Sequence, residues 1–467
     1  MKMTRREAMA AGLALVPGAL AAQDKESEKW KIHEWGTFTA LQDETGAPLG
    51  WINTEDEPVP PFCHRLSRSL LVPVDDLAPG YFKDAPRCHP DVILRLETPV
   101  VYFHPPKSAK LPAKVDLRVD FRGGWLTEYY PEAKVNAPGV QTRQLQYGRL
   151  EISTKGSLEW KGLQVGKPGT FPETKDAVWL SPRNVKSAPI TAADGESEQF
   201  LFYRGVAYCK APLITRRDGD GKMLTIYGWL PSDLVSQAPL RVPRLWLADI
   251  REDGTTAFRS IPAIKLLAGP QPLLATVPAT FEEKDYSMSR LASLREEMRD
   301  GLVKEGLNTD EAEALLNTWD ASYFRAHGLR LFFLVPRAWT DYVLPLKTSL
   351  AADITRVMIG RLELITPRQR ACLKRISSTT NPSSTWYQEW AEKNPEAWKR
   401  YQQKRQEGNL GELREQGIQI PDDYRAYLEL GRFRNAIVLD ELKRAPTDGL
   451  KKFVNVYDLH EARIADK

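Results

Sequence analysis

The spacing of apolar and polar residues changes near residue 280. Before that point, short β-prone runs alternate with turn-forming Pro, Gly, Asn and Asp, most clearly at 92–104, 114–121, 199–209 and 222–230. Within 114–121 every second residue is apolar and the others are all charged, which is typical of a strand with one buried and one wet face. Strands in series of this kind predict an antiparallel, sandwich-like β domain.

Beyond residue 280 the apolar residues first recur at helical spacing, from Met288 to Leu302. Asn308 and Glu311 have the spacing of a capping box, which predicts the start of a second helix. Two apolar runs at 329–336 and 355–367 follow and predict strands. This part of the chain should therefore combine helices with strands.

The last part of the chain follows a polar stretch at 377–385 and is rich in Lys, Arg and Glu. Pro395 and Pro421 stand where helices favour proline at their first position. The predicted fold class is α+β, with an antiparallel β-sandwich-like N-terminal part, an α+β section and a helical C-terminal tail. The predicted boundaries are a signal peptide at 1–22, a β-rich domain at 23–280, an α+β section at 281–376 and a helical tail at 377–467.

The N-terminus has the features of a cleaved export signal. A basic start precedes an apolar stretch from Ala8 to Ala21 that ends in small residues. Arg5 and Arg6 resemble a twin-arginine signal, so twin-arginine and general export both stay open. No later run approaches the roughly 18 apolar residues of a membrane span. We expect a periplasmic or secreted protein without a transmembrane segment after signal cleavage.

The charge balance argues against nucleic acid as a partner. The 467 residues carry a formal net charge of +4, and the signal segment accounts for half of it. A net charge this close to zero does not provide the basic surface that nucleic acid requires.

The four cysteines of an exported chain are expected to pair. We predict a bridge between Cys63 and Cys88, which are close in sequence, although three pairings are open. Each of these two cysteines precedes a histidine, His64 or His89. This repeat is the one metal-like arrangement among the local motifs, because thiolates and imidazoles bind zinc or copper.

Common catalytic motifs are absent from the sequence. The strings "HEWGT" and "HEARI" begin like the HExxH helix of zinc proteases, but Thr37 and Ile464 replace its second histidine. The sequence contains no GxSxG elbow, no GxGxxG fingerprint and no CxxCH haem attachment. It does not identify a cofactor.

Three carboxylates in apolar surroundings are the predicted catalytic residues. Glu34 stands in "HEWGTFT" (33–39), Glu97 in "LETPVV" and Glu128 in "LTEYYPEA". A buried carboxylate is costly unless it is paired. In one interpretation the three converge as acid, base or nucleophile for hydrolysis of a glycosidic bond. In the other, each acid pairs with an arginine and ties strands together.

Four further residues are predicted to bind a substrate at such a site. His33 and Arg204 would orient it, and Trp35 and Tyr129 would stack against a sugar ring. The partner would be a polysaccharide or another ligand of the cell envelope.

Several strings together resemble an uncharacterised group of exported bacterial proteins. They are "HEWGTFT", "LETPVVYF", "LTEYYPEA", "FLFYRGV", "LRLFFLVPRAWTD" and "VMIGRLELITP", and they span about residues 30 to 375. The resemblance implies export but no activity. That group more often has another aromatic residue where this chain has His104, which implies that His33 is the better candidate ligand.

Three functions are therefore predicted. The first is a carbohydrate-directed enzyme or binding protein of the cell envelope. The second is a metal-binding protein that uses His33, His64 and His89 with a nearby acid. The third is a non-catalytic envelope scaffold that docks through its helical tail.

Overall fold

The computed structural model describes residues 29–55, 58–67, 70, 72–73, 88–141, 146–406, 420–459, 461–462 and 464. The predicted signal peptide at 1–22 lies outside this part of the chain. Within it, no helix combines the length and the apolar character that a membrane crossing requires.

The centre of the fold is a mixed sheet of 16 strands built around the long strand β1 (Trp30–Gln42). Parallel pairing joins β1 along its whole length to β25 (Ala352–Leu364). On its other side β1 pairs antiparallel with β5 (Leu94–Leu96) and β6 (Val100–His104). Aromatic and β-branched residues suit β1 to this central position, and both of its faces are buried from Ile32 onward.

The remaining strands complete this sheet and four smaller ones. The other members of the large sheet are β3 (His64–Arg65), β7 (Ala113–Arg122), β8 (Gly124–Tyr130), β9 (Lys134–Asn136), β12 (Lys155–Val165), β13 (Ile190–Thr191), β14 (Ser197–Glu198), β15 (Leu201–Ala207), β19 (Leu245–Ile250), β20 (Thr256–Ile261), β23 (Gly328–Leu334) and β24 (Leu346–Thr348). The smaller sheets are β2 (Thr54–Glu55) with β4 (Val72–Pro73), β10 (Val140–Gln141) with β11 (Gln146–Tyr147), β18 (Leu240–Val242) with β21 (Ile264–Leu266), and β16 (Leu213–Arg217) with β17 (Met223–Gly228) and β22 (Leu273–Pro278).

The order of strands along the main path of the large sheet is β14-β13-β12-β8-β15-β5-β1-β25-β23-β19-β20. The predicted α+β class is confirmed, because helices and a large mixed sheet coexist. The sheet is not purely antiparallel, since its two longest strands, β1 and β25, run parallel. The section predicted at 281–376 supplies β23, β24 and β25 to the same sheet as the N-terminal strands.

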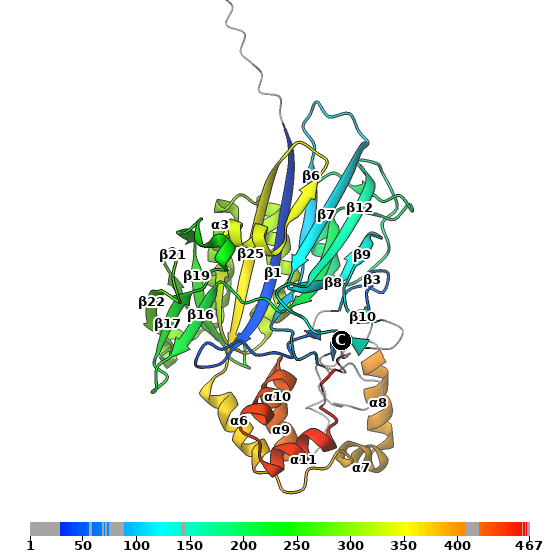
Figure 1. The fold of residues 1–467 in the computed structure, drawn as a ribbon. Helices are drawn as coiled ribbons and strands as arrows, with labels where there is room; N and C mark the ends of the chain where they lie inside the picture. Colours follow the sequence, from blue (N-terminus) through cyan, green and yellow to red (C-terminus); the bar gives the residue numbers. More distant parts are fainter. Residues whose placement is uncertain are drawn as a thin grey trace, which may run out of the picture.

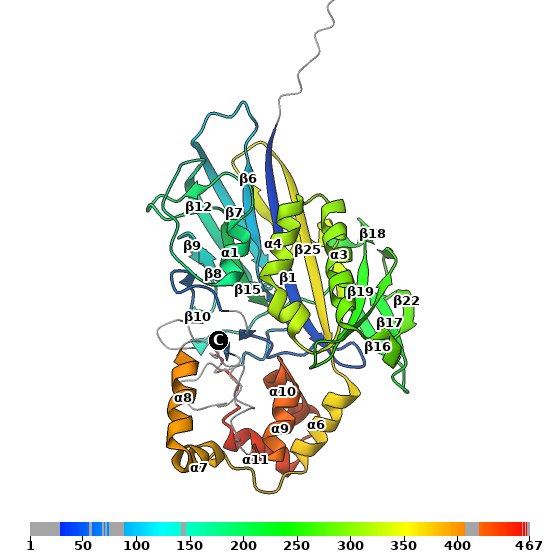
Figure 2. The same ribbon diagram turned by 180° about the vertical axis from the view of Figure 1, so that it is seen from behind.

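Helices lie on both faces of the sheet and form the C-terminal part of the chain. They are α1 (Ala177–Arg183), α2 (Ser232–Val235), α3 (Met288–Lys304), α4 (Thr309–Thr318), α5 (Arg337–Val343), α6 (Pro367–Ser377), α7 (Trp386–Lys393), α8 (Pro395–Gln406), α9 (Asp422–Glu429), α10 (Arg434–Arg444) and α11 (Asp448–Val456), with a 3-10 turn at Glu283–Asp285 and a π-helical turn at Asp320–Arg325. Figure 2 shows α1, α3 and α4 in front of the sheet, with α4 over β1. The capping box predicted at Asn308 and Glu311 is present at the start of α4.

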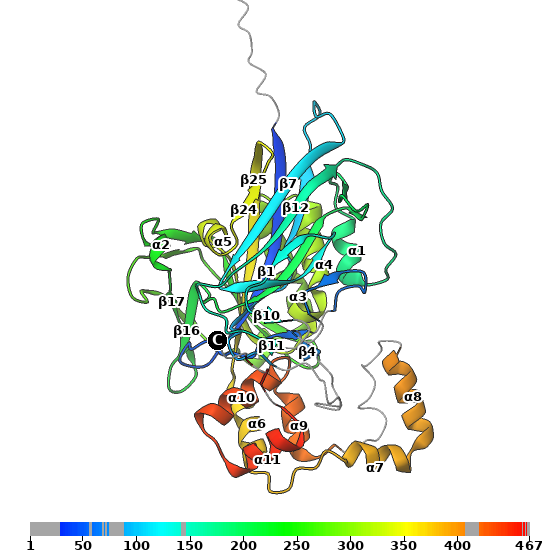
Figure 3. The same ribbon diagram turned by 45° about the vertical axis from the view of Figure 1, so that its right-hand side comes forward.

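The two faces of β1 contribute to different hydrophobic clusters. Trp35 packs with residues of α3 and α4 in one cluster. Phe38 belongs to the other cluster, together with the alternating apolar residues of β7 and with residues of β12. Figure 3 shows the strands β7 and β12. The sheet is thus enclosed on both sides, and a polar group on either face of β1 needs a polar partner.

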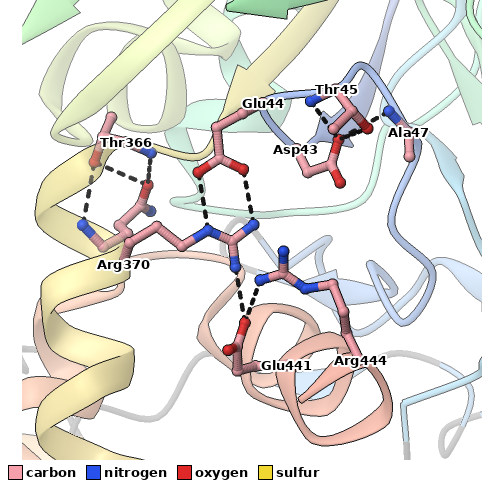
Figure 4. A network of polar contacts seen from close by, with 9 residues as sticks. Asp43, Glu44, Thr45, Ala47, Thr366, Arg370, Glu441 and Arg444 are labelled. Atoms are coloured by element: carbon pink, nitrogen blue, oxygen red, sulfur yellow. Dashed lines mark hydrogen bonds and ion pairs between the residues drawn. The ribbon is translucent and has the colours of Figure 1, made fainter. Parts of the chain in front are cut away.

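The C-terminal helices lie below one end of the sheet (Figure 1). Apolar residues of α6, α9, α10 and α11 share a cluster with Leu41 at the end of β1. Beside this cluster, Arg370 of α6 donates two hydrogen bonds to the carboxylate of Glu44, at 2.9 and 2.8 Å, and a third to Glu441 of α10 at 2.9 Å (Figure 4). One guanidinium therefore connects the loop after β1 with two helices.

Replacing Arg370 by alanine should loosen this junction. The Arg370 side chain is only 19% exposed and makes three charge-assisted bonds, so we expect a loss of about 1–3 kcal/mol in the free energy of unfolding. Urea denaturation and amide exchange in α6 and α10 would measure it. Arg368→Ala on the same helix is the matched control, because Arg368 is 57% exposed in its pair with Glu252, and its loss should stay within about 0.5 kcal/mol. Equal effects of the two substitutions would contradict this assignment.

Candidate metal centre

Strand alternation divides the segment "HEWGTFT" between the two faces of the sheet. Successive side chains of a strand point to opposite faces. His33 lies on the face of Trp35, under α4, whereas Glu34 lies on the face of Phe38. His33 and Glu34 were predicted to share one site, and the structure does not bring them together.

Two histidines and one glutamate meet on the face that α4 covers. His104, at the end of β6, pairs with Lys31 of β1, so its side chain lies on the same face as that of His33, two residues further along. Glu311 extends from the first turn of α4 toward both rings. His33 Nδ1 lies 2.8 Å from Glu311 Oε2, and His104 Nε2 lies 2.8 Å from Oε1. The ring centroids of the two histidines are 4.7 Å apart.

The Glu311 carboxylate is fixed in place and ionised. Its side chain is fully buried, and Oε2 also accepts the backbone N–H of Asn308 at 2.7 Å. Burial raises the pKa of Glu311, but hydrogen bonds from His104, His33 and Asn308 and the charge of His33 outweigh it and lower the pKa to about 2. At neutral pH this site therefore holds one negative charge between two imidazoles.

These three side chains are suited to bind a metal ion. One ligand atom from each lies within 4.8 Å of the others, and within the described part of the chain no other group of at least three His, Cys, Asp or Glu side chains is arranged in this way. Two imidazoles and a carboxylate are the ligands of catalytic zinc sites and of non-haem iron(II) sites, where further coordination positions stay open.

Sequence reasoning had reason to miss this group. Glu311 is 278 residues from His33 and 207 from His104, so no local motif joins them. The capping box accounts for Glu311 as a helix start, and the resemblance favours His33 over His104 as a ligand. The strands at 30–42 and 100–104 each contain a histidine. Only the register in which these two strands pair shows that the two rings lie on the same face.

Glu34 forms an ion pair on the opposite face. Its carboxylate accepts hydrogen bonds from Nε of Arg356, its direct neighbour on β25, and from the hydroxyl of Tyr203. Arg356 also donates to Asp341 and to the backbone of Leu344. Glu34 thus links strands β1, β15 and β25 through fully buried groups.

Glu97 is paired with an arginine from the helical tail. Thr39 Oγ1 donates to Glu97 Oε2 at 2.9 Å, and Arg432, between α9 and α10, donates to Oε1. Burial raises the pKa of Glu97, but the charges of Arg432, Arg95 and Arg361 outweigh it and lower the pKa to about 2. A general acid needs a pKa near the working pH, so this environment favours a permanent ion pair.

Glu128 and Arg204 are both buried and contact each other. Arg204 donates to the backbone carbonyl of Glu97 at 2.6 Å and lies 3.4 Å from Glu128 Oε2. Arg65 reaches the other oxygen of Glu128 at 3.2 Å. Arg204 therefore connects the Glu128 side chain with the backbone of Glu97, and guanidinium groups lie next to both carboxylates.

The two aromatic residues predicted to bind a sugar are part of the interior. Trp35 is completely buried, and Tyr129 is 7% exposed. The Tyr129 ring stacks on His64 at 5.4 Å between centroids, and burial together with Glu132 raises its pKa to about 12. Neither ring presents a face to solvent on which a sugar would stack.

His64 and His89 lie apart from His33 and have partners of their own. The two nitrogens of His64 contact Glu132 at 2.7 Å and Glu196 at 2.9 Å. His89 is buried against Trp125 and contacts the carbonyl of Gly148 at 3.2 Å. The predicted set His33, His64 and His89 does not converge; His33 meets His104 and Glu311 instead.

None of the four cysteines forms a disulfide in this structure. The predicted bridge between Cys63 and Cys88 is absent because the two side chains pack into different hydrophobic clusters, Cys63 beside Tyr130 and Trp179 and Cys88 beside the C-terminal helices. Proximity in sequence was a poor guide, because the two residues lie in different parts of the fold.

Comparisons with known proteins do not assign a class to this fold and site. No family model matches the sequence, and no curated protein matches it. Among solved structures, the yeast delta-COP-I mu-homology domain is similar at a TM-score of 0.23, alone with 10% identity and in complex with a Dsl1 WxWxV peptide with 9%. Each match covers 73% of this chain and 97% of that domain.

Replacing Glu97 by glutamine tests the structural role of its ion pair. We expect the free energy of unfolding at pH 7 to fall by about 3–5 kcal/mol, because the buried Arg432 loses its carboxylate. The pKa of Glu97 is lowered from 4.5 to about 2, so the charged carboxylate stabilises the fold above about pH 4.5 and this contribution is lost as the pH falls toward 2.

Denaturation between pH 7 and pH 2.5 would measure both effects. The variant should lose less stability on acidification than the wild type. Glu159→Gln serves as control, because Glu159 forms its ion pair with Lys161, which is 68% exposed. This substitution should change stability by less than about 0.5 kcal/mol. A Glu97→Gln variant with unchanged stability and unchanged acid dependence would contradict the assignment.

Proposed function

We propose that this protein binds one divalent transition-metal ion through His33, His104 and Glu311. The observation that supports the proposal is the convergence of two imidazole nitrogens and a buried, ionised carboxylate from three elements, β1, β6 and α4. Zinc and ferrous iron are the ions that this combination of ligands favours.

The spacing of the ligand atoms is compatible with an ion after a small adjustment. Ligands about 2.0–2.1 Å from a tetrahedral ion lie about 3.3 Å from each other. The present nitrogen to oxygen distances of 2.8 Å are those of hydrogen bonds that hold the side chains together. Separation by about half an ångström replaces each hydrogen bond with a bond to the metal.

The surroundings of Glu311 support the role of a ligand. Its Oε2 is held by the Asn308 N–H, which leaves Oε1, between the two rings, for an ion. Hydrogen-bonded partners of this kind orient ligating carboxylates in metal sites. Exposure of the side chains rises from 0% for Glu311 to 8% for His33 and 18% for His104. An ion would therefore enter, and keep its exchangeable ligands, on the His104 side.

Carbohydrate-directed activity, docking through the helical tail and export to the periplasm or medium stay predictions. The geometry supports the metal site better than glycoside hydrolysis, because Glu34, Glu97 and Glu128 are all close to guanidinium groups. An exported protein that binds a metal ion agrees with both the predicted signal peptide and the proposed site.

Zinc titration of the metal-free protein tests the proposal. We expect one zinc ion per chain by calorimetry and by elemental analysis. His104→Ala should weaken binding by more than about 100-fold, exceeding the 10–100-fold effect typical of a lost supporting residue. Affinity should also fall on acidification, because protons compete with the metal ion for its ligands.

His64→Gln is the matched control, since His64 also contacts two carboxylates but is not one of the three proposed ligands. The affinity of this variant for zinc should stay within about twofold of the wild type. Circular dichroism would confirm that both variants are folded. Zinc binding that survives His104→Ala, or that is lost with His64→Gln, would overturn the proposal.

A further inference from the structure

A cavity of about 330 Å³ lies where the end of β1 meets the small sheet of β16, β17 and β22. Ala40 and Gln42 of β1 line one side, and Ala211 and Ile214 line the side of β16. The loop from Thr45 to Pro48 closes a third side. The cavity is distinct from the proposed metal centre, because none of the three metal ligands lines it.

The walls of this cavity are held rigidly. The amide of Gln42 is 3% exposed; its Nε2 donates to the carbonyl of Leu213, and its Oε1 accepts from Thr215 N–H and Oγ1, at 2.8 to 2.9 Å. Gly46 has φ +83° and approaches β16 so closely that a Cβ would lie 2.4 Å from Ile214 and 2.7 Å from the Thr215 carbonyl. A larger residue at position 46 would be strained. The cavity is therefore preformed, as ligand sites usually are.

The loop that closes the cavity is ordered by its own hydrogen bonds. Asp43 Oδ1 accepts from the backbone N–H groups of Thr45 and Ala47, at 2.8 and 3.0 Å (Figure 4). The same loop carries Glu44, which Arg370 binds from α6. The position of the loop is thus fixed by its internal hydrogen bonds and by Arg370 of the C-terminal helices.

The chemistry of the lining selects a ligand with two different ends. The interior is aliphatic, formed by Ala40, Ile93, Ala211 and Ile214. Lys210 and Arg216 are both exposed and provide two positive charges, and the lining contains no acidic side chain. Arg216 is positioned by a hydrogen bond to Gln271 and lies 4.7 Å above the Tyr227 ring. An alkyl chain suits the interior, and an anionic head suits the two cations.

We propose that this cavity binds a small aliphatic carboxylate, with its alkyl chain against Ala40, Ala211 and Ile214 and its carboxylate at Lys210 and Arg216. The size supports a small ligand, because 330 Å³ is near the lower limit for ligand sites. The aliphatic lining offers no aromatic face for stacking, which argues against a sugar or a nucleobase as the occupant.

Calorimetric titration of the full chain with octanoate tests the inference. We expect saturable binding with one octanoate per chain and a lower affinity for 1-octanol, which has the same chain without the charge. Lys210→Gln/Arg216→Gln should weaken octanoate binding at least tenfold. Both positions are exposed, so the fold should persist.

Arg241→Gln/Lys265→Gln is the control. These two residues are opposite each other on β18 and β21, do not line the cavity, and change the net charge by the same amount when replaced. The affinity of this variant for octanoate should stay within about twofold of the wild type. A second variant, Ala211→Leu, fills the aliphatic interior and should abolish binding of octanoate while zinc binding is retained. Absence of saturable octanoate binding, or equal losses in the two double variants, would overturn the inference.

Discussion

The parallel pairing of β1 with β25 decides where every polar group at the centre of this protein lies. It fixes β1 between two layers, so that each of its side chains is assigned to one enclosed face. On one face His33 meets the helix that carries Glu311. On the other, Glu34 meets Arg356, its direct neighbour on β25. A shift of register by one residue would exchange the two faces and would place a histidine among aliphatic residues and a glutamate beneath the helices.

The buried charges are consistent with this arrangement. Glu34, Glu97 and Glu128 each lie next to at least one guanidinium, which reduces the cost of burying them. The partner of Glu97 comes from the helical tail, so the charge balance of the sheet depends on the docking of that tail. Glu311 differs, since its partners in the structure are two histidines and a backbone N–H. Imidazole can exchange its proton for a metal ion, whereas guanidinium cannot.

Much of the local structure could be predicted from the sequence, because local patterns determine it. The alternation at 114–121 became β7 with one apolar face, the spacing from Met288 became α3, and the capping box at Asn308 starts α4. The partner of each strand could not be predicted in this way. The run 355–367 indicates a strand, but nothing in it shows that the strand pairs with residues 30–42.

The candidate site was harder to predict for the same reason. The sequence indicates His33, but the resemblance to proteins that more often have another aromatic residue at the place of His104 argues against His104 as a ligand. Convergence with Glu311 depends on the register of β1 with β6 and on the helix that covers them. The prediction for the cysteines relied on closeness in sequence and on compartment, and packing into separate clusters keeps Cys63 from Cys88.

X-ray absorption spectroscopy of the zinc-loaded protein tests the central claim most directly, because it reports the atoms bound to the metal. The account predicts two imidazole nitrogens at about 2.0–2.1 Å and a carboxylate oxygen at about 2.0–2.2 Å, without sulfur. A shell that contains sulfur at about 2.3 Å, or one without imidazole, would show that the metal binds elsewhere and that the convergence of His33, His104 and Glu311 only joins a helix to a sheet.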